Sequence, residues 1–311
     1  MALSIVASAY GGPEVLELRD LPVPDPGPGQ VVIDVRAAGT NPIDWKIYSG
    51  TRGDDPAALP LRIGFEVAGV VSAVGPQARG VTGALRQGDE VLAFRVSGGY
   101  AERLLVPAKD VLHKPVSLGF EQASGLLLAG TTAVHALAVV GLGEGDTLLV
   151  HGGAGAVGLA AAQLARLRGA KVVATASAPR HDQLRACGAV PVEYGPGLLE
   201  RIKAVGPVTA ALDCVGTDEA VDASLALLAD KRRFVTIAAF PRAASEGFKA
   251  IGSQADPGVE IRDNARAELV KLAAEGELDV VVDRTYPLAE AAEAHRYLRT
   301  GHAKGKVVLI P

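Results

Sequence analysis

The spacing of hydrophobic and polar residues divides the chain into two parts with different patterns. From Met1 to about Pro115, short β-rich runs such as QVVIDVRAAG, FEVAGVVSAVG and DEVLAF alternate with turns. Short strands at this spacing predict a twisted antiparallel barrel. Beyond Val116, apolar runs such as DTLLVHG, KVVATAS and VTAALDCVG alternate with Ala- and Leu-rich helical stretches. Apolar strands joined by helices predict a parallel sheet covered on both faces.

The end of the chain resembles its first part more than its second. A helix is predicted over Asn264–Glu275, and the remaining residues read as a strand, a helix and a final strand. At 311 residues the chain exceeds the size that one core comfortably supports. We therefore expect an α/β protein with a discontinuous barrel domain over residues 1–120 and 265–311. A doubly wound parallel-sheet domain is expected over residues 121–264.

Charge and composition indicate which class of molecule the protein binds. The chain carries 31 basic and 35 acidic residues, for a net charge of -4, and 49% of its residues are hydrophobic. Such a balance argues against nucleic acid or an anionic membrane surface and favours a small-molecule partner. The apolar run Ala123–Leu142 contains Gly130, Thr132 and His135, so it predicts a buried helix rather than a membrane span.

Cysteine usage and the N-terminus suggest a location. The two cysteines cannot form a disulfide framework, which is typical of a reducing compartment. The first residues have no basic segment before their apolar run, so no export signal is expected. The expectation is a cytoplasmic protein.

A glycine-rich turn follows the first strand of the predicted parallel sheet. Gly153, Gly155 and Gly158 form G-x-G-x-x-G, directly after DTLLV and at the start of the helix that begins with Ala156 and Val157. The glycines permit a tight turn, close approach to a pyrophosphate and close packing of helix on strand. Phosphate then binds at the helix N-terminus, where N–H groups and the helix dipole favour an anion. This motif predicts a dinucleotide site.

The next strand indicates which dinucleotide is bound. Recognition of NAD requires Asp or Glu at the end of that strand, for the ribose hydroxyls. Here Ala176 and Ser177 take the place, and Arg180 and His181 follow. The missing anion would not repel a 2′-phosphate, and a guanidinium could pair with it. The expected cofactor is NADPH.

Several further motifs occur in one order along almost the whole chain: GTNPIDWKIYSG, GFEVAGVV, GTTAVHAL, GGAGAVGLAAAQLA, LDCVG and AEAHRYLRTGHAKGKVVL. On these motifs the chain resembles the zinc-independent quinone oxidoreductases of the medium-chain dehydrogenase/reductase superfamily, the ζ-crystallin-like group. The resemblance implies a GroES-like barrel joined to a Rossmann domain, an active site in the cleft between them, and a homodimer.

The resemblance also implies further cofactor contacts. Residues at the positions of Tyr194 and Arg180 surround the adenosine 2′-phosphate in the family, and the residue matching Thr131 lies near the nicotinamide. Val215 and Ile237 are included among the predicted cofactor contacts because ligands occupy the crevice at the carboxyl ends of strands. The predicted cofactor contacts are Thr131, Gly153, Gly155, Ala156, Val157, Gly158, Ser177, Arg180, Tyr194, Val215 and Ile237.

The catalytic residues are expected in the N-x-x-D motif of the family. Asn41 and Lys46, together with Tyr48, are predicted to stabilise the oxyanion that develops when hydride reaches a conjugated carbonyl. The proton would come from Lys46 or from solvent. The NPxDWK form is similar to that of the alkenal and enone reductase branch. Alternatively Lys46 is a surface cation paired with Asp44.

Zinc catalysis is not expected. The zinc-dependent relatives carry Cys near the place of Thr40 and His in the position of Phe65, and a catalytic zinc needs three such ligands. Only Glu66 offers a ligand at the matching places. The expected activity is NADPH-dependent reduction of quinones or α,β-unsaturated carbonyls. Reduction of an enoyl thioester, or NADPH binding with little turnover as a structural or sensing protein, remain as alternatives.

Overall fold

The computed structural model describes residues 1–252 and 258–311, which form two compact units. Unit 1 comprises residues 1–128, 270–275 and 280–311, and unit 2 comprises residues 129–269 and 276–279. These limits differ from the expected division at 120/121 and 264/265. The Leu128 amide donates to the Glu66 carboxylate at 2.9 Å and ties residues up to 128 to unit 1. The Asp279 amide donates to Gln163 at 2.8 Å and ties residues 276–279 to unit 2.

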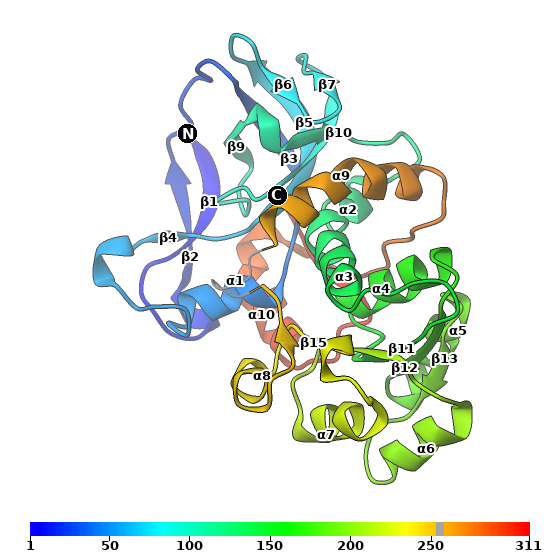
Figure 1. Ribbon diagram of the computed structural model, residues 1–311. Coiled ribbons are helices and arrows are strands. Elements are labelled where there is room, and N and C mark those ends of the chain that lie inside the picture. The colour runs from blue at the N-terminus through cyan, green and yellow to red at the C-terminus, as the bar shows by residue number, and fades with distance from the viewer. Residues whose placement is uncertain (253–257) are drawn as a thin grey trace. The chain divides into compact units, whose positions relative to one another are not determined.

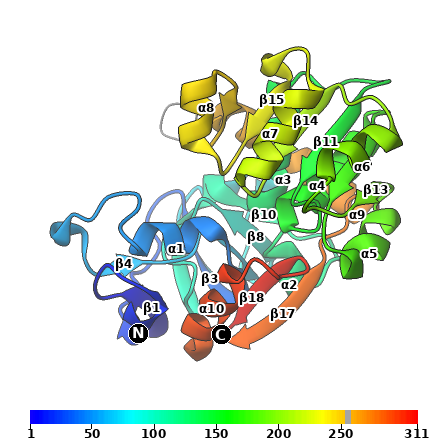
Figure 2. The same cartoon turned by 90° about the horizontal axis from the view of Figure 1, so that it is seen from below.

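Most strands of unit 1 pair in one sheet. Its described strands follow the path β10-β8-β5-β3-β18-β17, with β9 also on β3, and smaller sheets are ordered β2-β1-β4 and β6-β7. In Figure 2 the last strands of the chain, β18 and β17, follow β3 in this order. The strands are β1 (Ala2–Ala7), β2 (Leu16–Leu21), β3 (Gln30–Gly39), β4 (Leu61–Arg62), β5 (Glu66–Val74), β6 (Arg79–Gly80), β7 (Gly83–Ala84), β8 (Glu90–Phe94), β9 (Arg103–Pro107), β10 (Val111–His113), β17 (Val282–Pro287) and β18 (Lys306–Ile310).

The main sheet of unit 1 is antiparallel as predicted, with one parallel strand pair among its described strands. β17 and β18 run parallel, whereas β18 pairs antiparallel with β3. The reason is the helix α10 (Ala291–Arg299) between the two strands, since a parallel pair needs a crossover connection and a hairpin cannot supply one. Unit 1 also contains two further short α-helices, α1 (Pro42–Tyr48) and α2 (Phe120–Ala123), and several short 3-10 helices.

Unit 2 is a doubly wound parallel sheet. In its described part the strand order is β13-β12-β11-β14-β15-β16, and all neighbours are parallel. This order corresponds to the 3-2-1-4-5-6 arrangement of dinucleotide-binding folds, with the switch point at β11. Figure 1 shows β11, β12 and β13 side by side. The strands are β11 (Thr147–His151), β12 (Lys171–Thr175), β13 (Val190–Val192), β14 (Ala210–Asp213), β15 (Phe234–Thr236) and β16 (Lys249–Ala250). The predicted α/β class is confirmed.

Helices connect these strands. They are α4 (Ala156–Leu167), α5 (His181–Ala186), α6 (Leu198–Val205), α7 (Asp218–Leu227) and α8 (Phe240–Glu246). Two more, α3 (Leu127–Val139) and α9 (Val259–Ala274), begin in one unit and end in the other. The run predicted as a buried helix is α3, whereas α9 begins five residues before the predicted Asn264. Nowhere in residues 1–252 and 258–311 is a helix long and apolar enough to cross a membrane.

Candidate active site

The glycine-rich turn of unit 2 needs its glycines for space. A Cβ on Gly158 would lie 2.4 Å from the Gly152 carbonyl oxygen, and one on Gly153 would lie 2.6 Å from the Ala174 Cβ. Gly155 is the N-cap of α4, so Ala156 and Val157 form the first turn. N–H groups of a first turn have no partner within the helix, and they are therefore able to bind phosphate.

The other predicted cofactor residues of unit 2 gather at one edge of its sheet. Ser177 follows β12, Tyr194 follows β13, Val215 follows β14 and Ile237 follows β15. Because these strands lie in the same parallel sheet as β11, their carboxyl ends are at the edge that carries the glycine-rich turn. Val215 and Tyr194 are 47% and 53% exposed, so their side chains remain accessible. The structure thus brings these residues together as a dinucleotide site requires.

Arg180 and Thr131 are placed differently from the exposed members of this set. Arg180 is only 9% exposed and ends a short 3-10 helix, Ala178–Arg180, that Ser177 caps. His181 pairs one ring nitrogen with the Ala176 carbonyl at 3.3 Å. Thr131 is fully buried in α3. Of the neutral and cationic residues predicted after β12, Ser177 and His181 are therefore partly exposed, whereas Ala176 and Arg180 are buried.

Two buried polar residues that sequence reasoning missed hold the loops of this edge. Asp213, at the end of β14, accepts hydrogen bonds from the Val215 and Gly216 amides, both at 2.9 Å, and from the Thr236 hydroxyl at 2.7 Å. The Thr236 hydroxyl in turn accepts from the Ala239 amide at 2.8 Å. Asp213 therefore fixes the loops after both β14 and β15. The only signal in the sequence was its place at the end of an apolar strand.

His151 performs a similar role after β11. Its ring contacts the Ser224 hydroxyl at 3.1 Å and the Thr175 hydroxyl at 3.3 Å, and Thr175 accepts the Gly152 amide at 3.3 Å. Burial lowers the pKa of His151 to about 4, so the ring is neutral near pH 7. A neutral imidazole satisfies both hydroxyls without placing a charge beneath the glycine-rich turn.

In unit 1 the N-x-x-D motif forms the N-terminus of α1. Asn41 is the N-cap, and its backbone amide donates to the Asp44 carboxylate at 2.6 Å. Pro42 occupies the first helical position, where its missing N–H costs nothing. Asp44 therefore holds the loop, and the structure does not pair it with Lys46 as the alternative interpretation required.

Lys306 and Glu66 form a buried ion pair, and both contact the Asn41 side chain. The Lys306 ammonium donates to Glu66 at 2.7 Å, to the Asn41 side-chain oxygen at 2.7 Å and to the Thr40 carbonyl at 3.0 Å. Lys306 and Glu66 are 2% and 1% exposed. All three ammonium hydrogens have acceptors, so this charge pair is fully hydrogen-bonded. Lys306 faces the interior, which the sequence did not decide, and it links the starts of β18, β5 and α1.

This cluster changes the role expected for Asn41. Its amide nitrogen donates to the Glu66 carboxylate at 3.0 Å and to the Gly39 carbonyl at 3.3 Å. Both amide hydrogens are engaged, so Asn41 is not available in this structure as a donor to a substrate. The prediction that it stabilises an oxyanion directly is corrected to a positioning role.

Tyr48 belongs to a buried chain of hydrogen bonds that has a direction. The Tyr100 hydroxyl donates its single proton to Asp44 at 2.7 Å. The ring nitrogen Nε2 of His295, 3.0 Å from that hydroxyl oxygen, must therefore donate to it. Nδ1 of His295 is then the acceptor for the Tyr48 hydroxyl at 2.8 Å. Tyr48 is fully buried and already donates, so it too is corrected from an oxyanion donor to a structural residue.

The electrostatics of this chain follow from burial. Burial raises the pKa of the Asp44 carboxyl to about 7, although the hydrogen bonds from Tyr100 and Asn41 and the charge of Lys306 oppose the rise. Burial and the Arg299 guanidinium lower the pKa of His295 to about 4, which keeps the ring neutral. One oxygen of Asp44, Oδ1, has no hydrogen-bond partner. An unpaired buried oxygen favours the protonated carboxyl.

Lys46 is the remaining predicted donor. It is half-buried on α1, with its ammonium 5.8 Å from the centre of the Trp45 ring. Burial, followed by the charge of Arg52, lowers the pKa of Lys46.

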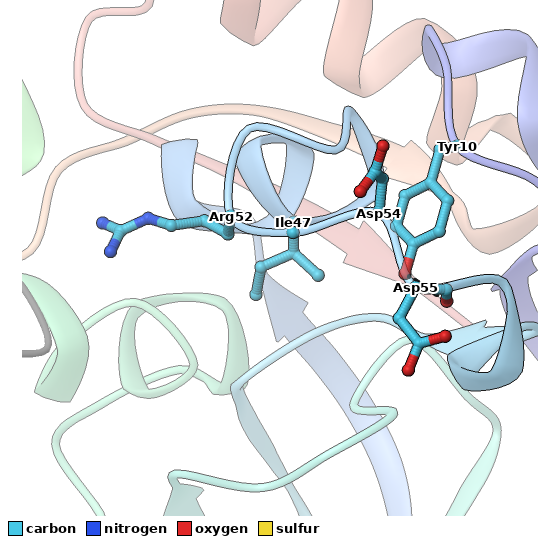
Figure 3. Close-up of a pocket in the computed structure, with 6 residues that line it drawn as sticks. Tyr10, Ile47, Arg52, Asp54 and Asp55 are labelled. Atoms are coloured by element: carbon cyan, nitrogen blue, oxygen red, sulfur yellow. Dashed lines mark hydrogen bonds between the residues drawn. The ribbon is translucent and has the colours of Figure 1, made fainter.

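A cavity of about 550 Å³ lies beside the next residue, Ile47. Figure 3 shows that the Arg52 side chain in this cavity extends away from Asp54 and Asp55. The lining residues are Tyr10, Ile47, Arg52, Gly53, Asp54 and Asp55.

Comparison with known proteins places the chain in a family. Residues 27–116 match the alcohol dehydrogenase GroES-like domain, and residues 188–309 match the zinc-binding dehydrogenase family. Human quinone oxidoreductase is 33% identical over 331 residues, which cover 97% of this chain and 95% of the human protein. This chain belongs to the quinone oxidoreductase family.

Other members extend the likeness. Quinone oxidoreductase from Pseudomonas aeruginosa is 33% identical with full coverage of both chains. The chloroplastic NADPH-dependent alkenal/one oxidoreductase of Arabidopsis thaliana is 33% identical over 98% of this chain and 78% of that protein. Escherichia coli quinone oxidoreductase in complex with NADPH superposes with a TM-score of 0.86, at 28% identity and 99% coverage of both chains.

In this quinone oxidoreductase family member, Thr40 and Glu66 at the positions compared with the zinc-dependent relatives are engaged in other contacts. Nowhere in residues 1–252 and 258–311 do three or more His, Cys, Asp or Glu side chains gather as a metal site. Thr40 donates its hydroxyl to the Val307 carbonyl at 2.8 Å, and Glu66 is engaged by Lys306. Where a metal would need ligands, unit 1 therefore has a carboxylate whose counter-charge is an ammonium.

Proposed function

We propose that this chain is an NADPH-dependent oxidoreductase that transfers a hydride to quinones or α,β-unsaturated carbonyls without zinc. The observation that carries the proposal is the neutral sheet edge of unit 2. There Ser177 stands where recognition of NAD would need an acid, beside a glycine-rich turn shaped for pyrophosphate. The names of the relatives support the same cofactor and acceptors.

The proposed chemistry assigns each part of the chain a task. NADPH supplies the hydride when bound, with its pyrophosphate held at the start of α4 and its 2′-phosphate near Ser177 and Tyr194. Lys46 donates to the carbonyl oxygen of the acceptor, because hydrogen-bond donors suffice when charge spreads onto an enolate. Asn41, Glu66 and Lys306 hold the start of α1 that presents Lys46.

The decisive experiment is NADPH oxidation against a panel of quinones, enones and enoyl thioesters. We expect turnover with quinones or enones and a higher kcat/KM with NADPH than with NADH. Activity confined to enoyl thioesters would contradict the proposed acceptors. Tight NADPH binding without turnover on any member of the panel would contradict catalysis and indicate a binding protein.

Changing Ser177 to glutamate is expected to reverse the cofactor preference. A carboxylate at the end of β12 repels the 2′-phosphate and offers acceptors to the ribose hydroxyls of NADH. Juxtaposed like charges cost several kcal/mol, so the NADPH/NADH ratio of kcat/KM is expected to fall about 100-fold. Ser177→Gln is the matched control, because it has the same size without the charge. An equal fall in both variants would contradict the electrostatic explanation.

Changing Lys46 to methionine is expected to lower kcat with an enone about 100-fold, the scale for losing one oxyanion donor. Lys46→Arg keeps a cationic donor and is expected to retain most of the activity. Lys171→Met, at an exposed lysine of unit 2, controls for loss of charge. Full activity of Lys46→Met would show that solvent, rather than Lys46, serves the oxyanion.

We further propose that the chain forms a homodimer in the cytoplasm. The assembly is proposed from the family alone. The location is supported by Cys187 and Cys214, which are free thiols in the structure and fit a reducing compartment. Light scattering on the purified protein tests the assembly, and a single-chain mass would contradict it.

A further inference from the structure

An exposed tyrosine at the dinucleotide edge sits in a loop that is unusually well fixed. Tyr194 lies in the loop 193–197, between β13 and α6, and is 53% exposed. β13 is in register with β12 so that Val192 is opposite Thr175, and the Ala176 amide donates to the Val192 carbonyl at 3.0 Å. Tyr194 and Ser177 each stand two residues beyond this matched pair, so they begin adjacent loops at the same edge.

One guanidinium closes the loop from within. Arg201, on the first turns of α6, donates from Nε to the Glu193 carbonyl at 2.9 Å, and from its two terminal nitrogens to Pro196 and Gly195 at 2.8 Å each. These three carbonyls flank Tyr194 on both sides along the chain. Because a guanidinium is a rigid planar fork, three bonds to it fix the relative positions of the carbonyls.

A second charged residue holds the loop from another helix. Glu219, in the first turn of α7, accepts the Gly195 amide at 3.0 Å. Gly195 and Gly197 have φ values of 98° and 83°, a backbone that side chains rarely adopt. Two glycines and two charged side chains thus fix a surface loop whose large accessible side chain is Tyr194.

We propose that Arg201 and Glu219 are positioning residues for recognition of the adenosine 2′-phosphate, acting through the loop that presents Tyr194. The inference rests on the proposed use of NADPH. The loop of Tyr194 begins next to the loop of Ser177. A phenol hydroxyl on such a fixed loop donates to the phosphate dianion without the loss of freedom that an unrestrained loop would undergo on binding. NADH has no 2′-phosphate, so its binding gains nothing from a fixed Tyr194 loop. The clamp, meaning the hydrogen bonds of Arg201 and Glu219 to this loop, therefore contributes to the preference for NADPH over NADH and not to hydride transfer.

The test compares Arg201→Met, Arg201→Lys and Glu219→Gln with wild type. Dissociation constants for NADPH and NADH are measured by calorimetry, together with kcat. We expect Kd for NADPH to rise about tenfold in Arg201→Met, the scale of one charge-assisted hydrogen bond, while Kd for NADH and kcat stay within twofold. Arg201→Lys keeps the charge but not the fork and is expected to show most of the loss. Arg185→Met, at an exposed arginine on α5, is the control.

A double-mutant cycle with Tyr194→Phe identifies the route. If the clamp acts through the tyrosine hydroxyl, adding Arg201→Met to Tyr194→Phe causes little further loss of NADPH affinity. Additive losses, or an equal loss for both cofactors, would overturn the inference. Should Arg201→Met fail to fold, Glu219→Gln carries the same comparison, with hydrogen exchange at the Gly195 amide reporting release of the loop. If wild type itself binds both cofactors equally, the proposed function fails first; if it prefers NADPH and the variants do not change that, only this inference fails.

Discussion

Changing Lys306 to methionine is expected to lower the free energy of unfolding of unit 1 by about 3–5 kcal/mol. The substitution leaves the Glu66 carboxylate buried without its counter-charge, and the Thr40 carbonyl and Asn41 side chain without their donor. The single tryptophan, Trp45, packs against the core of unit 1. Its fluorescence during urea denaturation therefore reports this unit rather than the whole chain.

Further variants separate the energy of the Lys306–Glu66 ion pair from the general effect of removing a charge. Glu66→Gln leaves the Lys306 ammonium buried without its counter-charge and is expected to lower the free energy of unfolding by a similar amount. The double variant Lys306→Met/Glu66→Gln is expected to lose at least about 2 kcal/mol less than the sum of the two single losses. Arg19→Met breaks an exposed pair with Glu17 in the same unit and is expected to cost at most about 1 kcal/mol. Additive losses in the double variant would contradict a coupled buried pair.

The difference in stability between wild type and Asp44→Asn is expected to depend strongly on pH. The pKa of Asp44 is about 7 in the folded protein, above its usual value of 3.8. A raised carboxyl pKa contributes stability that is fully present below about pH 4 and is lost as pH rises through 7. With about 1.4 kcal/mol per pKa unit, the advantage of wild type over Asp44→Asn is expected to fall by on the order of 4 kcal/mol between pH 4 and 8.

His295 makes the comparison with Asp44→Asn necessary. Its pKa is lowered to about 4 in the folded protein, from 6.5. Its contribution is therefore present above pH 6.5 and is lost as pH falls toward 4, the opposite direction to that of Asp44. The wild-type profile alone would show partial cancellation. Urea titrations of both proteins at several pH values, followed by Trp45, provide the difference, and a difference independent of pH would contradict a raised pKa for Asp44.

The elements that could be predicted from the sequence are those with local causes. The run QVVIDVRAAG coincides with β3, and KVVATAS contains β12, because apolar and β-branched residues determine a strand over a few positions. The short strand β13 (Val190–Val192) was missed, since three residues containing a proline do not make a pattern. It forms only because β12 supplies a parallel partner.

The same difference between local and long-range causes applies to the residues of the candidate site. The glycine-rich turn, Ser177 and Tyr194 could be predicted as cofactor contacts because these assignments follow directly from a motif or from the family resemblance, and they stay predictions. The donors assigned to Asn41 and Tyr48 were corrected because their hydrogen bonds go to residues far along the chain. Glu66 lies 25 positions from Asn41, and His295 lies 247 positions from Tyr48. No spacing within a motif reveals that such an acceptor is present.

The sequence by itself determined the α/β class, the alternation of helices with apolar strands in the second part of the chain, and the neutral residues that follow β12. Hydrophobic period, turn glycines and the residue at a strand end act over short distances, and they keep their meaning before the chain folds. Only the tertiary structure decided that Lys306 faces Glu66, that Tyr100 and His295 complete a directed chain to Asp44, and that Arg201 closes the loop of Tyr194. These are pairings of charges and hydrogen bonds, and their energy exists only once folding removes both partners from water and brings them within about 3 Å.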